Sequence, residues 1–122
     1  MVLALAQYAP QGWTLGLGEF VHESYLGQPL KGIIGVVAQG EFFTADEIKV
    51  RLVQAEEAKS LGFDVGYQPV RFDFVPQGKG SNLRVKVSSR GKIDEPYLNI
   101  VVELQWPGGV IYREYVFLLD LP

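Results

Sequence analysis

A long run of alternating apolar and polar residues near the end of the chain constrains the fold more than any other segment. Between Glu95 and Asp120 the pattern repeats every two residues, and only the segment from Trp106 to Gly109 interrupts it. This alternation is typical of a strand with one buried face, and a Trp-Pro-Gly-Gly sequence favours a turn. The segment therefore predicts a long antiparallel hairpin. The face expected to point into the core carries Leu98, Ile100, Val102, Leu104 and Trp106.

Four more strands are predicted from the same period, over residues 19–26, 30–39, 70–74 and 83–88. Residues 30–39 are apolar almost throughout, which suggests a central strand covered on both faces. Residues 15–18 precede the first predicted strand, and the glycines among them suggest a flexible hinge. Six strands joined by turns, with helices that do not alternate with them, indicate a mostly β protein with an Ig-like antiparallel β-sandwich.

Helical character is confined to a short insertion near residues 44–61. Thr44 and Glu47 have the spacing of a capping box, and Ile48, Leu52 and Ala55 follow at helical intervals. Gly62 is suited to the left-handed position that ends a helix. The segment is expected to form either one bent helix or two short helices in tandem.

The chain length predicts one domain, because 122 residues with 48% hydrophobic content are enough for a single core. We expect this domain to span residues 15–122 and residues 1–14 to be a flexible lead-in or a signal-peptide remnant. Ala4-Leu5-Ala6 has the Ala-x-Ala form of a signal-peptidase site. No apolar run reaches the length of a membrane span.

Composition argues against most catalytic chemistry. The net charge of -3 gives no cationic field, so nucleic acid is not expected as a partner. The absence of cysteine removes thiolate nucleophiles and Cys-based metal sites. His22 is the single histidine and has no second His or Cys to share a metal with. No catalytic residue, cofactor or metal site is predicted, and surface interaction is favoured over catalysis.

Four residues are candidate partner contacts. If the first or last strand lies at a sheet edge, its free backbone groups could pair with an extended peptide. Arg113 and Glu114 could then guard that edge or form a cross-strand ion pair, and Tyr115 lies beside them. Trp13 is the best candidate for an exposed aromatic side chain.

Several literal motifs, in order, resemble the N-terminal domain of the FimV family. They are Leu-Gly-Leu-Gly-Glu-Phe from residue 15, Ser-x-Leu-Gly-Gln-Pro-Leu from residue 24, Glu-Pro-Tyr-Leu-Asn from residue 95, Trp-Pro-Gly-Gly from residue 106 and Arg-Glu-Tyr-x-x-Leu-Leu-Asp from residue 113. The resemblance spans roughly residues 15 to 120. The family tends to have Asn-Gln-Pro-Leu followed soon by an acidic residue. This chain differs in two places, with Gly27 in place of the asparagine and Lys31 directly after the leucine.

The resemblance implies a non-enzymatic, periplasmic interaction or scaffold domain, the exported N-terminal region of an inner-membrane protein. Such proteins support type IV pilus assembly, twitching motility and cell-pole organisation, so the implied partners are envelope and pilus-assembly proteins. Peptidoglycan would be contacted through a LysM module outside this chain. An alternative is that this domain itself binds peptidoglycan or another carbohydrate, by stacking sugars on Trp13 or Trp106.

Overall fold

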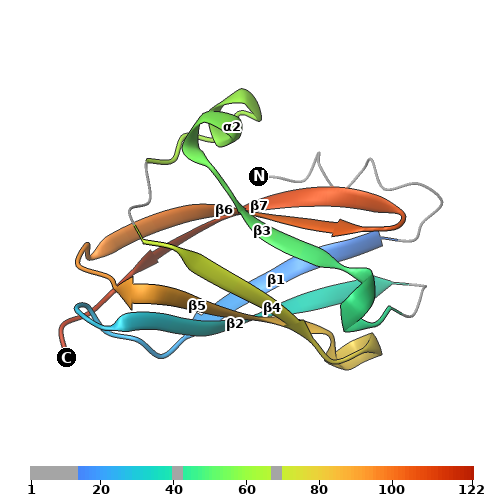
Figure 1. Ribbon diagram of the computed structural model, residues 1–122, viewed down its shortest axis with the longest axis horizontal. Helices are drawn as coiled ribbons and strands as arrows, with labels where there is room; N and C mark the ends of the chain where they lie inside the picture. The colour runs from blue at the N-terminus through green and yellow to red at the C-terminus, as the bar shows by residue number, and fades with distance from the viewer. Residues whose placement is uncertain (1–13, 40–42, 67–69) are drawn as a thin grey trace.

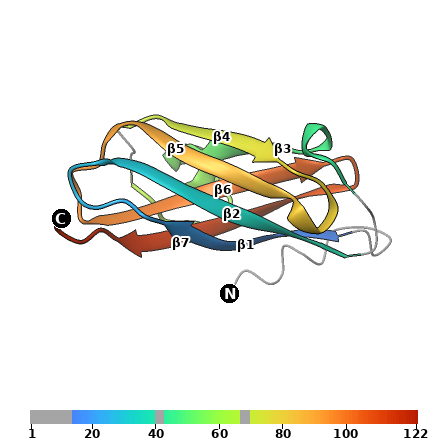
Figure 2. The same ribbon diagram turned by 90° about the horizontal axis from the view of Figure 1, so that it is seen from below.

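The computed structural model describes residues 14–39, 43–66 and 70–122, and it shows two antiparallel sheets packed face to face (Figures 1 and 2). The four-stranded sheet has the order β1 (Thr14–His22), β2 (Pro29–Gln39), β5 (Arg84–Lys92) and β4 (Phe72–Gln77). The three-stranded sheet has the order β3 (Lys49–Val53), β6 (Tyr97–Trp106) and β7 (Gly109–Leu118). The predicted mostly β antiparallel sandwich is confirmed.

The closing hairpin forms as predicted, with its turn at the Trp-Pro-Gly-Gly segment. β6 and β7 pair continuously from Tyr97 opposite Leu118 to Trp106 opposite Gly109, so Pro107 and Gly108 form the turn. All five side chains predicted to face inward are buried, and the Trp106 side chain lies in the main core. A Cβ atom at Gly109 would lie 3.1 Å from the Trp106 ring, which explains the small residue at that end of the turn.

The first sheet differs from the expectation in two places. The segment expected to be a flexible hinge is part of β1, because Leu15 and Leu17 insert into the core and the segment pairs with the end of β2. A bulge between Leu17 and Phe20 changes the register of the strand. Coverage of β2 on both faces is also wrong, since Ile33 and Val37 on its outer side are exposed.

The insertion near residues 44–61 contains a strand between two short helical segments. A single turn of 3₁₀ helix, η2 (Ala45–Glu47), follows Thr44, whose backbone N–H donates to Glu47 Oε1 at 2.9 Å as the capping box predicts. The continuous or tandem helix is wrong, because Lys49–Val53 forms β3 against β6. The only regular α-helix of the described residues, α2 (Ala55–Ser60), follows β3, and Gly62 has the predicted positive φ of +96°.

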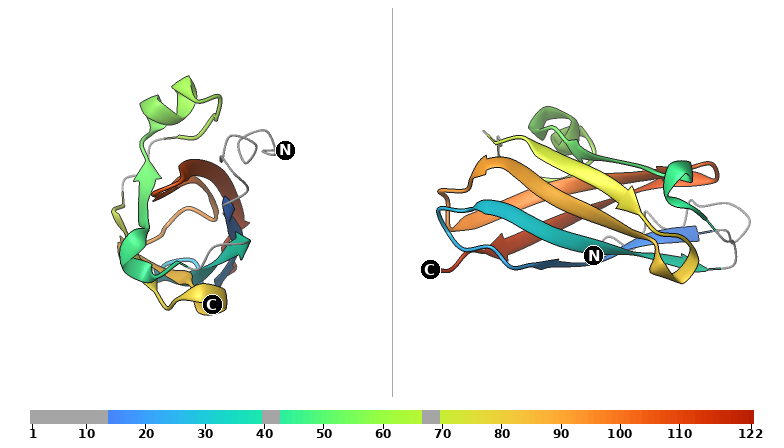
Figure 3. Two further views of the ribbon diagram at one scale, coloured as in Figure 1. Left: turned by 90° about the vertical axis from the view of Figure 1, so that its right-hand side faces the viewer. Right: turned by 60° about the horizontal axis from the view of Figure 1, so that its bottom comes forward.

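α2 stands on the outer side of the three-stranded sheet (Figure 3). There Ala58 packs with Val53 of β3 and Val101 of β6 in a second small core, which Phe63 and Val65 partly cover. Val101 points to this outer core while its neighbour Val102 points to the main core, because successive strand residues face opposite sides. The middle of β6 is therefore buried on both faces.

Candidate interaction surface

Two of the predicted partner residues close the gap between the two sheets. Tyr115 is only 5% exposed, its ring meets Phe20 edge to face at 5.6 Å, and its hydroxyl donates to the Gly18 carbonyl at 2.7 Å. Arg113 Nη1 donates to the carbonyls of Leu17 and Gly18 at 2.7 and 3.1 Å. We call these contacts the β1–β7 seam. The Arg113 and Tyr115 side chains therefore occupy backbone carbonyls of β1, at the sheet edge considered for pairing with an extended peptide.

The other two predicted partner residues lie elsewhere. Glu114 is partly buried on the outer face of the three-stranded sheet, where its Oε2 accepts a hydrogen bond from Asn99 Nδ2 at 3.0 Å. Trp13 lies outside the described residues. The structure thus does not gather Arg113, Glu114 and Tyr115 into one exposed patch, and Tyr115 has almost no surface to offer a partner.

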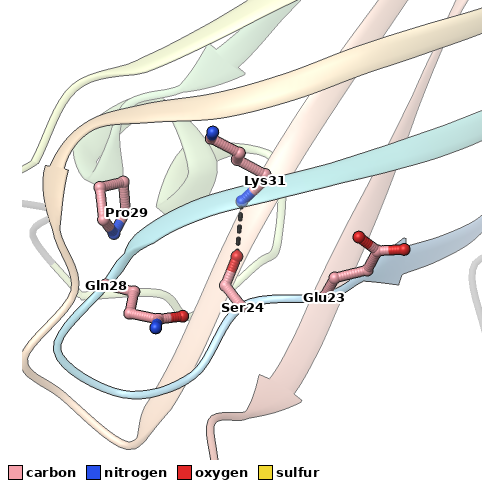
Figure 4. Close-up of a pocket in the computed structure, with 5 residues that line it drawn as sticks. All are labelled: Glu23, Ser24, Gln28, Pro29 and Lys31. Atoms are coloured by element: carbon pink, nitrogen blue, oxygen red, sulfur yellow. Dashed lines mark hydrogen bonds between the residues drawn. The ribbon is translucent and has the colours of Figure 1, made fainter. Parts of the chain in front are cut away.

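An open pocket of about 320 Å³ lies at the turn between β1 and β2 (Figure 4). Its walls are Glu23, Ser24, Gln28, Pro29 and Lys31. The Ser24 hydroxyl accepts the backbone N–H of Lys31 at 2.8 Å, and the Gln28 side chain accepts the backbone N–H of Tyr25 at 3.0 Å. These polar residues fold the turn back on itself and leave the charged ends of Glu23 and Lys31 exposed.

Two neighbouring segments hold this turn in place. The Leu26 N–H donates to the Asp120 carbonyl, and the Gly27 N–H donates to the Ile93 carbonyl, both at 2.8 Å. Ile93 in turn donates its N–H to the Gln28 carbonyl at 3.0 Å. Gly27 has a φ of +87°, which favours glycine at this point of the turn. The β1–β2 turn, the β5–β6 connection and the end of the chain therefore form one assembled surface.

A second, smaller pocket of about 170 Å³ adjoins the first, since both include Glu23 and Ser24. His22, Tyr25, Leu118 and Asp120 complete its lining. Ser24, His22 and Asp120 are the residue types of a hydrolase triad. The Ser24 hydroxyl oxygen accepts the Lys31 N–H that closes the turn. His22 and Glu23 are consecutive residues, and both line this pocket because β1 ends at His22.

Exposed apolar side chains continue from the smaller pocket onto the outer face of the hairpin. Leu118 is 67% exposed and pairs across the strands with Tyr97, which is 55% exposed. Val116 follows on the same side of β7 and is also exposed. We name the two pockets together with Tyr97, Val116 and Leu118 the turn-end surface. The motif that begins at residue 24 pointed to this turn, but sequence reasoning had no signal that Leu118 lies beside it.

Charged side chains form a separate cluster under α2. Arg51 binds Glu57 of the helix at 2.7 Å and Glu103 of β6 at 2.9 Å. These hydrogen bonds lower the pKa of Glu57 and raise that of Arg51. Tyr112 lies beside the cluster, and burial followed by its contact with Glu103 raises the pKa of the Tyr112 hydroxyl. The cluster therefore fastens α2 to the three-stranded sheet.

Residues 14–39, 43–66 and 70–122 contain no group of three or more His, Asp or Glu side chains placed to hold a metal ion. In the same ranges, no helix has the length and apolar character needed to cross a membrane.

Comparison with known proteins identifies the fold and the family. The model of the FimV N-terminal Ig-like domain matches residues 15–122. The chain is 37% identical over 109 residues to the motility hub protein FimV of Pseudomonas aeruginosa, in strains PAO1 and UCBPP-PA14. That alignment covers 88% of this chain and 12% of the curated relatives. No solved structure matches significantly. The two-sheet sandwich and the matched residues together place the chain in the FimV N-terminal Ig-like domain family.

Proposed function

We propose that this domain is a non-enzymatic periplasmic interaction module of a FimV-like protein, and that it helps to scaffold type IV pilus assembly, twitching motility and cell-pole organisation. The observation that carries the proposal is the turn-end surface, where a rigidly held polar turn adjoins exposed Leu118, Tyr97 and Val116. A rim of polar groups around exposed apolar side chains is a common form of protein-binding surface. The relatives are named as motility hub proteins, which supports pilus-related partners.

The test compares two exposed leucines in the full-length protein of the source organism. Leu118→Ser alters the turn-end surface, and Leu61→Ser is the matched control because Leu61 is an exposed leucine beside α2. We expect Leu118→Ser to reduce twitching and the recovery of pilus-assembly proteins from envelope extracts, and Leu61→Ser to preserve both. Equal effects of the two variants, at equal protein levels, would refute an interaction role for this surface.

Absence of catalysis is tested at the pocket that holds His22. His22→Gln keeps a hydrogen-bonding side chain of similar length but removes the general base that a Ser-His-Asp mechanism requires. We expect twitching to be unchanged in this variant when the protein is expressed at the normal level. Loss of twitching with normal recovery of partners would instead indicate chemistry at this pocket.

The carbohydrate-binding alternative has little support among the described residues. Trp106, one of the two tryptophans considered for sugar stacking, lies in the core, and Trp13 lies outside the described residues. Calorimetric titration with soluble peptidoglycan fragments separates the two functions. We expect no saturable heat of binding from this domain, whereas saturation that Trp13→Ala abolishes would favour the carbohydrate module.

A further inference from the structure

The outer face of the four-stranded sheet concentrates positive charge in a chain whose net charge is -3. On β5 every second residue points to this face, and Arg84, Lys86 and Arg90 are all exposed there. Lys31 of β2 pairs with Ser88 on the same face. Arg71 precedes β4, is exposed, and lies two residues before Asp73, which shares this face. We call these five side chains the cationic face.

Few acidic groups offset this charge. Asp73 of β4 is paired with Arg90 at 2.9 Å, and Glu19 lies in the bulge of the edge strand β1. Glu23 lies beyond the end of β1 and lines the turn pocket with Lys31. The carboxylates that make the whole chain acidic are therefore mostly on other surfaces, and the net charge conceals a local cationic field.

Aliphatic side chains lie among the cations. One row across the sheet runs from Val21 through Ile33 and Lys86 to Val75, because these residues are cross-strand partners on β1, β2, β5 and β4. Val21 is 64% and Val75 is 49% exposed, and Ile33 is exposed as well. Val37 adds another exposed aliphatic group further along β2. The face is thus a two-dimensional array of cations and short apolar groups spread over four strands.

We propose that the cationic face rests on a membrane surface rich in anionic phospholipid headgroups. A planar array of Lys and Arg side chains matches the diffuse negative charge of such a surface, to which each cation near the membrane adds attraction. Interspersed aliphatic groups add apolar contact at the headgroup boundary. The described side chains of this face include no aromatic ring, so it lacks the stacking groups that sugars and single-stranded nucleic acids use.

The experiment measures co-sedimentation of the 122-residue chain with lipid vesicles. One set contains only phosphatidylcholine, and the other contains about one third phosphatidylglycerol, at salt concentrations from about 0.05 M to about 0.5 M. We expect binding to the anionic vesicles alone, and its progressive loss as salt screens the charges. Equal binding to both vesicle types, or no binding at low salt, would overturn the proposal.

Two double variants with the same loss of charge locate the binding surface. Lys31→Gln with Lys86→Gln removes two cations from the face, and Lys49→Gln with Lys59→Gln removes two exposed lysines from other elements. At about 1 kcal/mol per cation, the first pair should weaken vesicle binding roughly 30-fold, and the second should change it little. Equal weakening by both pairs would show a response to net charge alone and overturn the assignment.

A competing ligand is tested on the same samples. A soluble peptide that alternates Glu with Val presents an acidic protein segment, and a short DNA duplex presents a phosphate polymer. Salt-sensitive binding of either ligand to the wild-type chain, without binding to anionic vesicles, would assign the cationic face to that ligand and refute the membrane proposal. The leucine comparison at the turn-end surface does not depend on this outcome.

Discussion

The β1–β7 seam should show a cooperative loss of stability when both of its side-chain donors are removed. Tyr115→Phe keeps the ring against Phe20 and removes the hydroxyl that donates to the Gly18 carbonyl. Arg113→Met keeps much of the aliphatic stem and removes the donors to the Leu17 and Gly18 carbonyls. In each single variant the Gly18 carbonyl retains one donor of the pair, but in the double variant it loses both.

The expected magnitudes follow from this shared acceptor. Tyr115→Phe should lower the free energy of unfolding by about 1 kcal/mol, and Arg113→Met by about 1.5 to 3 kcal/mol because its donor is charged. The double variant should lose about 1 kcal/mol more than the sum, the cost of leaving a partly buried carbonyl without either side-chain donor. The Arg113 guanidinium also lies 5.0 Å from the centre of the Tyr115 ring, and this contact largely cancels in the cycle because phenylalanine preserves the ring.

Urea unfolding followed by tryptophan fluorescence measures the four free energies, with equal m-values required for the comparison. Tyr97→Phe is a matched control, because the Tyr97 side chain is exposed and its change should leave stability within about 0.5 kcal/mol of the wild type. The reasoning would be refuted if the double variant lost no more unfolding free energy than the sum of the two single variants. That result would show that the two donors do not act on the Gly18 carbonyl as a shared acceptor.

Three further perturbations test the core, the packing of β2 and the cluster under α2. Leu104→Ala should lower the free energy of unfolding by about 2 to 5 kcal/mol in urea titrations, because Leu104 is fully buried. Gly32→Ala should cost about 1 to 3 kcal/mol and alter the ring resonances of Phe20 in NMR spectra, because the added Cβ would lie 2.3 Å from that ring. The hydrogen bond from Arg51 lowers the pKa of Glu57 below its ordinary 4.5, so this pair stabilises the fold above that pH and the stabilisation is lost as pH falls through the lower folded-state pKa. Glu57→Gln should therefore flatten the dependence of the unfolding free energy on pH in acid, and an unchanged dependence would contradict the ion pair.

The architecture was accessible from local patterns, but the order of elements in the insertion was not. The alternation from Leu98 to Trp106 reports burial on one face directly, and the structure buries those residues. Residues 48–55 carry both periods, because Ile48, Leu52 and Ala55 follow helical spacing while Lys49–Val53 alternates as a strand. Pairing with β6 decides between the two patterns, and that pairing lies about fifty residues away in the chain.

The candidate surfaces were less accessible because they are made by neighbours distant in sequence. The sequence alone is compatible with Tyr115 at an exposed sheet edge. Its side chain is buried because β1 packs beside β7, a contact between segments about one hundred residues apart. Leu118 joins the turn at Ser24 only through the packing of the chain end against that turn. The cationic face is invisible to the net charge, although the alternation of Arg84 and Lys86 along β5 was a usable signal for it.

The geometry of the β1–β7 seam has a consequence for mechanical force: we expect the seam to resist a pull along the domain. β1 and β7 run side by side in the same direction, so the start of β1 and the end of β7 lie toward opposite ends of the sandwich (Figure 1). A pull between those two points slides one strand along the other and loads the Arg113 and Tyr115 contacts together, in shear, while a peeling geometry would break them one at a time. Forced unfolding is governed by the unfolding rate. Because the seam contacts must break together, we expect them to slow unfolding under tension along the long axis of the domain.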